Sequence, residues 1–557
     1  MRTHRTARAR AAGITLLGAA ALAVLPVACG GSGGARRNVL LISIDSLRQD
    51  RLGIAGHRPE FAPEIAVSPN LDLLGAEGAV FDAAWSPTSW TLPAHVSLLT
   101  GVSPRLHGVE TDEFALHPDR PTLAQVFQAA GYATAGVYSG PFLDPRYGFG
   151  RGFDRYESAM ASPESKTEQI RAFELQRIAA GGSPLDDAEK RILVGQFAHW
   201  DITSPRVNEL ALAFLRGQTP GTPFFLFLHY FDVHYDYIPD RAEAGLGERF
   251  DPGYRGPFNG DNWYKDERVR DVMSGERRIG ERDLRHVMAL YDAEIHWVDR
   301  HVGAVLGALE ELGLADETLV CVTADHGDEF FEHGGIGHRS TLFSELTHVP
   351  LLLRVPGETP PGLRVRTSVG LVDVAPTLLD YAGVAGFGVP VEGLSLRELV
   401  ENDRGSDRPV LQRLIAHEPA RHHLNIRDGW RRGDRAVLRR FEIDPQASSA
   451  DSLRVRQERA VDGTPRHFVF VTGRRERERV ALAAEDPRRS AALGDFCGDF
   501  RCAEQRRAAW AGTTPVALPP PGEDDMQALA ALGYAMAGPA AASPLRFLAP
   551  LPEPCLP

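Results

Sequence analysis

The chain has 557 residues, a length that allows two or three domains with a sizeable hydrophobic core. Hydrophobic residues make up 43% of the chain and charged residues 24%, which are proportions typical of a globular protein. The formal net charge of −13 at pH 7 argues against a nucleic-acid partner, because an acidic surface repels phosphate.

Residues 1–29 are expected to be a signal peptide rather than part of the fold. An arginine-rich stretch without acids is followed by an apolar stretch that is too short to span a bilayer comfortably. Small residues precede Cys29 and a Gly/Ser-rich linker, 30–37, follows it, as in a bacterial lipoprotein signal. Pro26 departs from that pattern, so secretion without lipidation is the alternative. Both predict an extracytoplasmic protein in the periplasm or cell envelope, either lipid-anchored to the membrane surface or secreted.

The remaining cysteines suggest neither a thiolate nucleophile nor a zinc site. Cys497 and Cys502 are close enough in the sequence to pair across a short loop in an oxidising compartment. Cys321 lies in an apolar run and is expected to be a small, buried hydrophobic residue.

Apolar runs alternate with helical patterns in the part of the chain that follows the linker. The first run, residues 38–45, ends in an acid, and buried parallel strands carry functional groups at their C-terminal ends. Strands that alternate with helices predict an α/β fold with a mostly parallel central sheet flanked by helices. The further strand runs are 134–138, 223–231, 318–323 and 349–355, and the helical patterns are 70–77, 122–130, 207–215 and 284–312.

These elements predict a main domain over residues 38–400. Two segments within it interrupt the alternation. Residues 160–190 are polar and helical, and residues 240–282 are rich in Gly, Asp and Arg. Both are interpreted as insertions that shape the mouth of a substrate site.

The composition changes near residue 401 and again near residue 512. Residues 401–511 are rich in arginine and contain shorter strand-like runs, which predicts a smaller β-containing C-terminal domain. Residues 512–557 are an Ala/Pro-rich tail, with one short amphipathic helix expected at 524–534. The strand-like runs are 410–415, 436–441 and 467–471.

The stretch 88–101 begins with hydroxyl side chains, among them Thr91, and continues into an apolar run. Proline near its start and glycine at its end predict a short helix over 93–99. A helix N-terminus presents N–H groups and the positive end of a dipole, so an anionic group bound there would lie beside Thr91. The alternative is a buried helix with an ordinary capping threonine.

Two strand ends carry candidate metal ligands. Asp45 ends the first apolar run, and the pair Asp325 and His326 follows the fourth run. Adjacent carboxylate and imidazole groups supply the oxygen and nitrogen donors of a compact metal site. The alternatives are a capping role for Asp45 and a solvated acidic loop for the second pair. Asp328 and Glu329 are expected to be acids in the first turn of a helix rather than ligands.

The run TLPAHVSLLTGVSP at 91–104 resembles the signature loop of the sulfatase family, within the alkaline phosphatase superfamily. In that family a Cys or Ser nucleophile is followed by any residue, then by Pro, Ser and Arg, and by a helix that ends in Leu-Thr-Gly. Thr91 stands here at the nucleophile position and His95 at the Arg position. The motif DSLRQDRLG that begins at Asp45 resembles relatives with a Thr or Ser nucleophile. Because separate motifs recur in the right order, the resemblance covers residues 38–386 and implies an alkaline phosphatase-like fold.

The resemblance also implies which residues carry the chemistry. It places His234 opposite the substrate oxygen, with Asp232 orienting it or binding a second metal, and it places His338 near the position of an anion-binding lysine. His229 is interpreted as a structural histidine. The catalytic candidates are thus Thr91, His95, His234 and His338. The metal candidates are Asp45, Thr91, Asp325 and His326, with Asp232 and His338 as candidates for a second site.

Mixed oxygen and nitrogen ligation favours Zn²⁺ or Mn²⁺, with Mg²⁺ and Ca²⁺ as alternatives. Coordination would lower the pKa of the Thr91 hydroxyl enough for it to attack near neutral pH. The covalent Thr91 intermediate would then be hydrolysed or passed to an acceptor alcohol. The three catalytic histidines would stabilise the developing charge or protonate the leaving oxygen.

Threonine at position 91 sets the expected substrate class. Sulfatases oxidise their Cys or Ser to formylglycine, whereas threonine cannot give an aldehyde because its Cβ carries a methyl group. A Thr91 ester must instead be hydrolysed at the heteroatom, which is routine for phosphate in this superfamily and harder for sulfate. The expected reaction is therefore cleavage of a phosphate mono- or diester, or phosphoglycerol transfer. The alternatives are sulfate ester hydrolysis by unmodified Thr91 and a non-catalytic surface binding protein on the same fold. The substrate would be a phosphorylated or sulfated lipid, glycan or small molecule.

Overall fold

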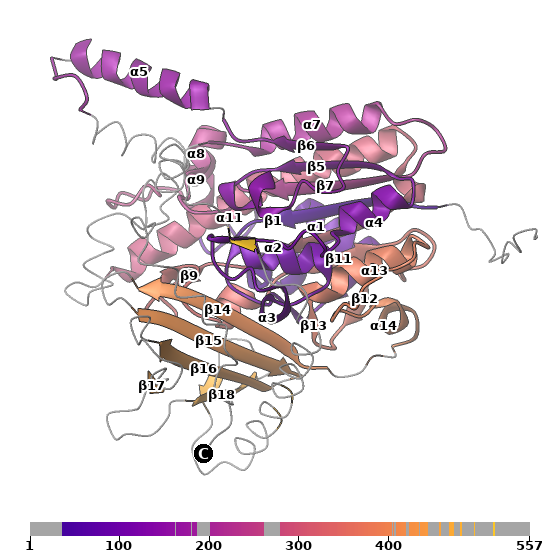
Figure 1. Cartoon of the computed structure of the whole chain (residues 1–557). Coiled ribbons are helices and arrows are strands. Elements are labelled where there is room, and N and C mark those ends of the chain that lie inside the picture. The colour runs from indigo at the N-terminus through magenta and orange to yellow at the C-terminus, as the bar shows by residue number, and fades with distance from the viewer. Residues whose placement is uncertain are drawn as a thin grey trace, which may run out of the picture. The chain divides into compact units, whose positions relative to one another are not determined.

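The computed structural model describes most of the chain up to residue 443 and short stretches beyond it (Figure 1). The signal peptide with Cys29, the pair Cys497 and Cys502, and the helix at 524–534 lie outside the described residues, so these expectations stay predictions. The described residues are 36–161, 163–179, 181–186, 201–260, 279–403, 405, 408–418, 423–433, 435–443, 456–457, 467–472, 479–481, 495, 499 and 516–517.

Within these residues, eight strands form a central sheet in the order β12-β2-β11-β8-β1-β7-β5-β6. The neighbours β8, β1, β7, β5 and β6 all run parallel, which confirms the predicted α/β fold with a mostly parallel sheet. The run predicted at 349–355 is a buried strand, but β11 runs antiparallel to β8 and to β2. The strands are β1 (Asn38–Ile44), β2 (Ala79–Phe81), β5 (Ala133–Tyr138), β6 (Arg155–Ser158), β7 (Phe224–Tyr230), β8 (Thr318–Ala324), β11 (Leu351–Arg354) and β12 (Leu363–Val365).

The strands β1, β7 and β8 are buried along their whole length, which explains why each is a continuous apolar run rather than an alternating one. Helices flank this sheet in two packed groups. The long helix α11 (Glu281–Glu311) contacts α1 (Pro69–Glu77) and α7 (Ser204–Arg216). The helix α2 (Thr91–Thr100) contacts α4 (Leu123–Ala129) and α13 (Val374–Tyr381).

The helix α11 shows how the pattern produces the packing. Its apolar residues recur every three or four positions, and this stripe is buried against the neighbouring elements while the opposite face carries charged residues. The buried stripe includes Val287, Leu290, Tyr291, Ile295, Val298, Val302, Val305 and Leu309.

After the central sheet the chain forms a second, antiparallel sheet, which agrees with the predicted β-containing C-terminal part (Figure 1). Its strand β15 was not anticipated, because its polar sequence HLNIRDGWRR contains no apolar run. The domain boundary near residue 400 stays a prediction. The strands are β14 (Val410–Glu418), β15 (His423–Arg432), β16 (Arg435–Ile443), β17 (Arg456–Gln457), β18 (His467–Thr472) and β19 (Arg479–Ala481).

This sheet is hydrogen-bonded to the loop that precedes α2. The N–H of Arg413 donates to the carbonyl of Pro87 at 2.8 Å, and the side-chain amide of Gln412 donates to the carbonyl of Ser86 at 2.8 Å. Arg431 donates to the carbonyl of Leu342 at 2.8 Å. The C-terminal sheet therefore supports two loops of the main domain, one of which leads directly to Thr91.

The two interpreted insertions contain helices in their described parts. They are α5 (Pro163–Ala179), α8 (Pro239–Ala242) and α9 (Leu246–Phe250). In the part of the chain that the structure describes, no helix combines the length and the apolar character needed to cross a membrane.

Candidate active site

Two acids lie side by side because β1 and β8 are parallel neighbours. The register pairs Ile44 with Ala324, so the residues that follow, Asp45 and Asp325, leave the same edge of the sheet. Both side chains are fully buried. The backbone N–H groups of Ser46 and His326 donate to Oδ1 of Asp325 at 3.2 and 2.8 Å, which fixes the orientation of that carboxylate.

Thr91 reaches these acids from the first turn of α2. The helix starts at Thr91, two residues earlier than the sequence indicated, because Trp90 is extended and its carbonyl accepts from the N–H of Ala94. Gly101 ends the helix with a φ of 67°, a left-handed conformation that glycine adopts without steric cost. The hydroxyl of Thr91 is consequently held at the positive end of the helix dipole.

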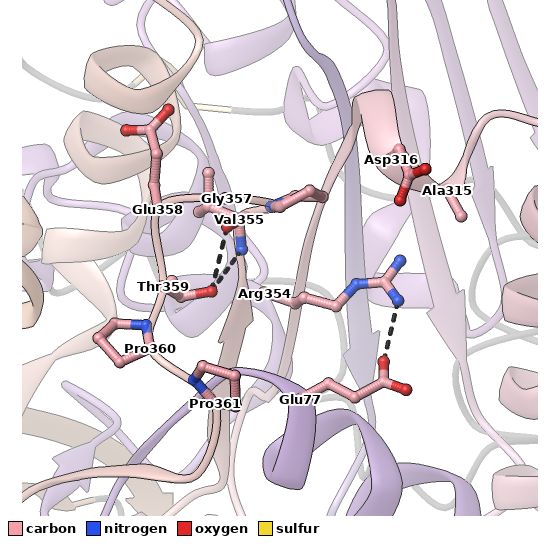
Figure 2. Close-up of a pocket in the computed structure, with 11 residues that line it drawn as sticks. Glu77, Ala315, Asp316, Arg354, Val355, Gly357, Glu358, Thr359, Pro360 and Pro361 are labelled. Atoms are coloured by element: carbon pink, nitrogen blue, oxygen red, sulfur yellow. Dashed lines mark hydrogen bonds and ion pairs between the residues drawn. The ribbon is translucent and has the colours of Figure 1, made fainter.

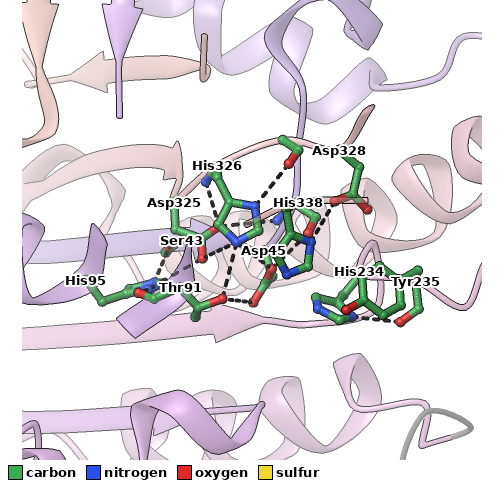
Figure 3. Close-up of polar contacts among 12 residues, drawn as sticks. Ser43, Asp45, Thr91, His95, His234, Tyr235, Asp325, His326, Asp328 and His338 are labelled. Carbon is green, nitrogen blue, oxygen red and sulfur yellow. Dashed lines mark hydrogen bonds and ion pairs between the residues drawn. The ribbon is translucent and has the colours of Figure 1, made fainter. Parts of the chain in front are cut away.

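The side chains of Asp45, Thr91, Asp325 and His326 form one strand-end cluster (Figure 3). Oγ1 of Thr91 lies 3.4 Å from Oδ2 of Asp45 and 3.2 Å from Nε2 of His326. The same nitrogen lies 3.4 Å from Oδ2 of Asp325 and 3.7 Å from Oδ1 of Asp45. Nδ1 of His326 is bonded to the carbonyl of Gly327 at 3.1 Å, which leaves Nε2 directed into the cluster.

The cluster concentrates negative charge away from solvent. Burial raises the pKa of Asp45 to about 6 and also raises the pKa of Asp325, whose carboxylate is further destabilised by Asp45. Burial opposes protonation of His326, but the carboxylates of Asp325 and Asp45 outweigh it and raise its pKa. A cation beside the two carboxylates would offset this cost.

A divalent cation fits this donor set. Oδ2 of Asp325 is buried and accepts no hydrogen bond in the described part of the chain, so it is available as a ligand. Donor atoms bound about 2.1 Å from one cation lie about 3.0 to 3.5 Å apart when the angles between them are 90° to 110°. Three of the distances among the four side chains, 3.2 to 3.4 Å, fall in this range.

Two further predicted residues, His234 and His338, lie beside the strand-end cluster. The ring of His338 is 4.3 Å from the ring of His326 and 4.9 Å from that of His234, measured between centroids. Nδ1 of His234 is bonded to the carbonyl of Tyr235 at 2.7 Å. The ring of His338 therefore packs against a member of the cluster, and the ring of His234 packs against His338.

The interpretation of Asp328 as a first-turn helix acid is wrong. The residues directly after His326 form no helix, and Asp328 lies in the loop before the short strand β9 (Glu329–Phe330). Its fully buried carboxylate is bonded to Nδ1 of His338 at 2.8 Å and accepts from the hydroxyl of Tyr237 at 2.6 Å. Asp328 thus orients His338, and only the fold of the loop brings the two residues together.

His95 lies next to the cluster, and both of its ring nitrogens are hydrogen-bonded. Nδ1 is bonded to the carbonyl of Thr91 and Nε2 to the hydroxyl of Ser43, both at 2.9 Å. Burial lowers the pKa of His95 to about 3, so the ring is neutral. In this arrangement His95 holds the first turn of α2 in place, whereas the sequence suggested a direct contact with substrate.

Asp232 is placed apart from the strand-end cluster. Its oxygens accept from the N–H and hydroxyl of Thr203, from the N–H of Ser204 and from the indole of Trp297. These bonds fix the start of α7 against α11, so the structure gives Asp232 a capping role and does not bring it together with His338.

His229 is brought into the cluster although the sequence suggested a structural role. Its Nε2 lies 3.4 Å from Oδ2 of Asp45, and its ring packs edge-on against His95 at 4.9 Å between centroids. Burial lowers the pKa of His229 to about 4, against the opposing effect of Asp325. The only sequence signal for this position was a histidine one residue before the end of a buried strand.

A separate pocket of about 530 Å³ lies at the opposite edge of the sheet, near the C-terminal end of β11 (Figure 2). It is lined by the acids Glu77, Asp316 and Glu358 around Arg354, whose guanidinium donates to Glu77 at 3.0 Å. With more acids than bases, this pocket does not suit an anionic ester.

A parallel α/β sheet that carries a hydroxyl, two carboxylates and an imidazole at one edge defines the class of metal-dependent ester hydrolases. The family model described as Sulfatase matches residues 37–384. The chain therefore belongs to the sulfatase family, within the alkaline phosphatase superfamily.

Curated relatives agree with this assignment. An arylsulfatase from Clostridium perfringens is 26% identical over 405 residues, which cover 67% of this chain and 80% of the relative. An iduronate 2-sulfatase from Mus musculus is 27% identical over 428 residues, which cover 67% of this chain and 73% of the relative. Among solved structures, the phosphonate monoester hydrolase of Agrobacterium radiobacter matches with a TM-score of 0.59 and 18% sequence identity. The match covers 87% of this chain and 100% of the hydrolase chain, and it shows a likeness of fold.

Proposed function

We propose that the protein is an extracytoplasmic, metal-dependent hydrolase of phosphate esters, with Thr91 as its nucleophile and Zn²⁺ or Mn²⁺ as its cofactor. The observation that carries the proposal is the position of the Thr91 hydroxyl, 3.2 Å from His326 and 3.4 Å from Asp45 at the start of α2. A hydroxyl held between a carboxylate and an imidazole, at a helix N-terminus, is placed to attack an anionic centre.

The residues of this chain support a two-step reaction. Thr91 Oγ1 gives its proton to Oδ2 of Asp45, to which it donates at 3.4 Å, and forms a bond to phosphorus while the bond from phosphorus to the leaving oxygen breaks. His234 and His338 lie beside the cluster and supply a proton to the departing alcohol. Water, or an acceptor alcohol in a transferase, then displaces Thr91. A bound divalent cation supplies positive charge that lowers the pKa of the hydroxyl and stabilises the charge that develops on the substrate.

Threonine supports phosphate over sulfate as the transferred group. A threonine ester has no gem-diol through which the bound group could be expelled by elimination, so its release requires attack of water on the heteroatom. Phosphorus accepts such attack more readily than the sulfur of an unactivated sulfate ester. The substrate is an anionic phosphate mono- or diester, including a phosphoglycerol donor.

Hydrolysis of a sulfate ester is the second candidate. It is favoured by the family assignment and by the names of the curated relatives, an arylsulfatase and an iduronate 2-sulfatase. Both candidates use the same cluster and differ only in the group that Thr91 accepts.

The deciding experiment compares three esters on the purified, metal-loaded protein: an aryl phosphate, a bis-aryl phosphate and an aryl sulfate. We expect kcat/KM for at least one phosphate ester to exceed that for the sulfate by about tenfold or more, which corresponds to about 1.4 kcal/mol of activation free energy. The Thr91→Ala variant is the matched control for contaminating phosphatases. Faster turnover of the sulfate would select the second candidate, and no turnover of any ester would favour a non-catalytic binding protein.

The extracytoplasmic part of the proposal rests on the sequence of residues 1–29. Cells that produce the full chain should carry the protein in the membrane fraction of the envelope, and Cys29→Ala should release it or block its maturation if the cysteine is lipidated. Recovery of both proteins in the cytoplasmic fraction would contradict this part of the proposal.

A further inference from the structure

The imidazole of His229 is fully shielded from solvent and interacts with the backbone of Ser139. Its Nε2 has no hydrogen-bond partner in the described part of the chain. A buried polar group left in this state costs about 1 to 3 kcal/mol. His95, which packs against it, differs in this respect because both of its nitrogens are bonded at 2.9 Å.

The nitrogen of His229 points at the strand-end cluster. Nε2 lies 3.4 Å from Oδ2 of Asp45, which equals the distance from that oxygen to the hydroxyl of Thr91. A ligand atom of His229 also lies within 4.8 Å of one of Asp325. These spacings are those of atoms that share one cation, since ligands about 2.1 Å from a metal lie about 3.0 to 3.5 Å apart when adjacent and about 4.2 Å apart when opposite.

The residue that follows Asp45 adds no carboxylate to the cluster, because it is Ser46. The hydroxyl of Ser46 donates to Oδ1 of Asp45 at 3.0 Å, so its side chain supports the first acid instead of adding a carboxylate. The adjacent strand β7 places His229 where it can supply the additional donor.

We propose that Nε2 of His229 is a direct ligand of the cation in the strand-end cluster. This inference rests on the metal centre of the proposed function. The site then contains two imidazoles, from His229 and His326, two carboxylates, from Asp45 and Asp325, and the hydroxyl of Thr91. Two nitrogen donors select Zn²⁺, Mn²⁺ or Co²⁺ and disfavour Ca²⁺, which prefers a shell of oxygens.

The test counts coordinated imidazoles directly. The full chain is loaded with ¹¹³Cd²⁺ after labelling of its histidine rings with ¹⁵N, and nitrogen–cadmium couplings are recorded by NMR. We expect two coupled imidazoles in the wild-type protein and one in His229→Asn. His286→Asn is the matched control, because His286 is also buried but its Nδ1 is bonded to Asp251 at 2.6 Å. This variant should keep both couplings.

The count separates a ligand from a residue that only orients Asp45. Loss of an orienting group alone can weaken metal binding by about 10- to 100-fold, so affinity does not decide the question. A single coupled imidazole in the wild-type protein, or two in His229→Asn, would overturn the proposal. A single coupled imidazole in the wild-type protein would overturn the proposal even if His229→Asn fails to fold. Two couplings in a protein that hydrolyses no ester would leave this inference standing while the proposed function fails.

Discussion

Oγ1 of Thr91 lies 3.2 Å from Nε2 of His326, although the two residues are 235 positions apart in the chain. The contact joins the first turn of α2 to the loop after β8. Thr91 is 3% exposed and His326 is fully buried, so the pair meets inside the protein at the carboxyl edge of the sheet. The position of this hydroxyl leads to the first prediction.

Thr91→Ala should lower kcat by about 10³-fold or more, because it removes the nucleophile and one donor of the cluster. Ser89→Ala is the matched control. Ser89 is the nearest alternative hydroxyl in the loop, but it donates to the carbonyl of Thr341 at 2.7 Å. We expect Ser89→Ala to stay within about tenfold of the wild-type kcat. Steady-state kinetics on the best ester of the panel measure both, and an active Thr91→Ala would remove Thr91 from the mechanism.

Removal of the metal should abolish activity and lower the melting temperature. Asp45 and Asp325 are buried next to each other, so without a cation their charges oppose folding. The melting temperature with and without chelator, followed by reloading, measures this effect. Zn²⁺ or Mn²⁺ should restore both activity and stability, and Ca²⁺ should do so less well. Equal stability with and without chelator would show that the cluster binds no structural cation.

Acidification should destabilise the protein through His107, which supports α2. Burial lowers the pKa of His107 to about 3 from its ordinary 6.5. The unfolded chain therefore binds a proton below pH 6.5 that the folded protein resists, and the free energy of unfolding falls as the pH drops. The cost is about 1.4 kcal/mol per pH unit, or about 2 kcal/mol at pH 5.

His107→Gln tests this pH dependence without adding a charge. The imidazole of His107 contacts the hydroxyl of Ser97 at 3.1 Å and accepts from the N–H of Val109 at 3.0 Å, and an amide can make similar bonds. Denaturant titrations at pH 5 and pH 7 should give a smaller difference in the free energy of unfolding for the variant than for the wild-type protein. An identical difference in both proteins would remove His107 as the cause.

Asp232→Ala should destabilise the protein and leave its metal content unchanged. The substitution removes the acceptor for Thr203, Ser204 and Trp297 and should cost about 2 to 4 kcal/mol of unfolding free energy. Metal analysis and a denaturant titration of the same preparation check both halves. A lower metal stoichiometry with unchanged stability would show instead that Asp232 is a ligand of a second metal.

Much of the fold could be predicted from local pattern. Strands such as β1, β7 and β8 are continuous apolar runs because both of their faces are buried, and α11 shows the helical repeat because one face is buried. The strand β15 lacked such a signal, since it buries polar side chains that are paired with distant parts of the chain, as Arg431 is with Gln412 and Leu342.

The sequence by itself determined the candidate donors of the strand-end cluster, because Asp45 and Asp325 follow apolar runs and Thr91 begins a short helix. Only the tertiary structure decided the positions of His229, Asp328 and Asp232. Strand register, loop conformation and the capping of α7 set which of these side chains faces the cluster. These contacts join residues far apart in the chain, and the sequence of a local segment does not identify the distant residue that will lie beside it.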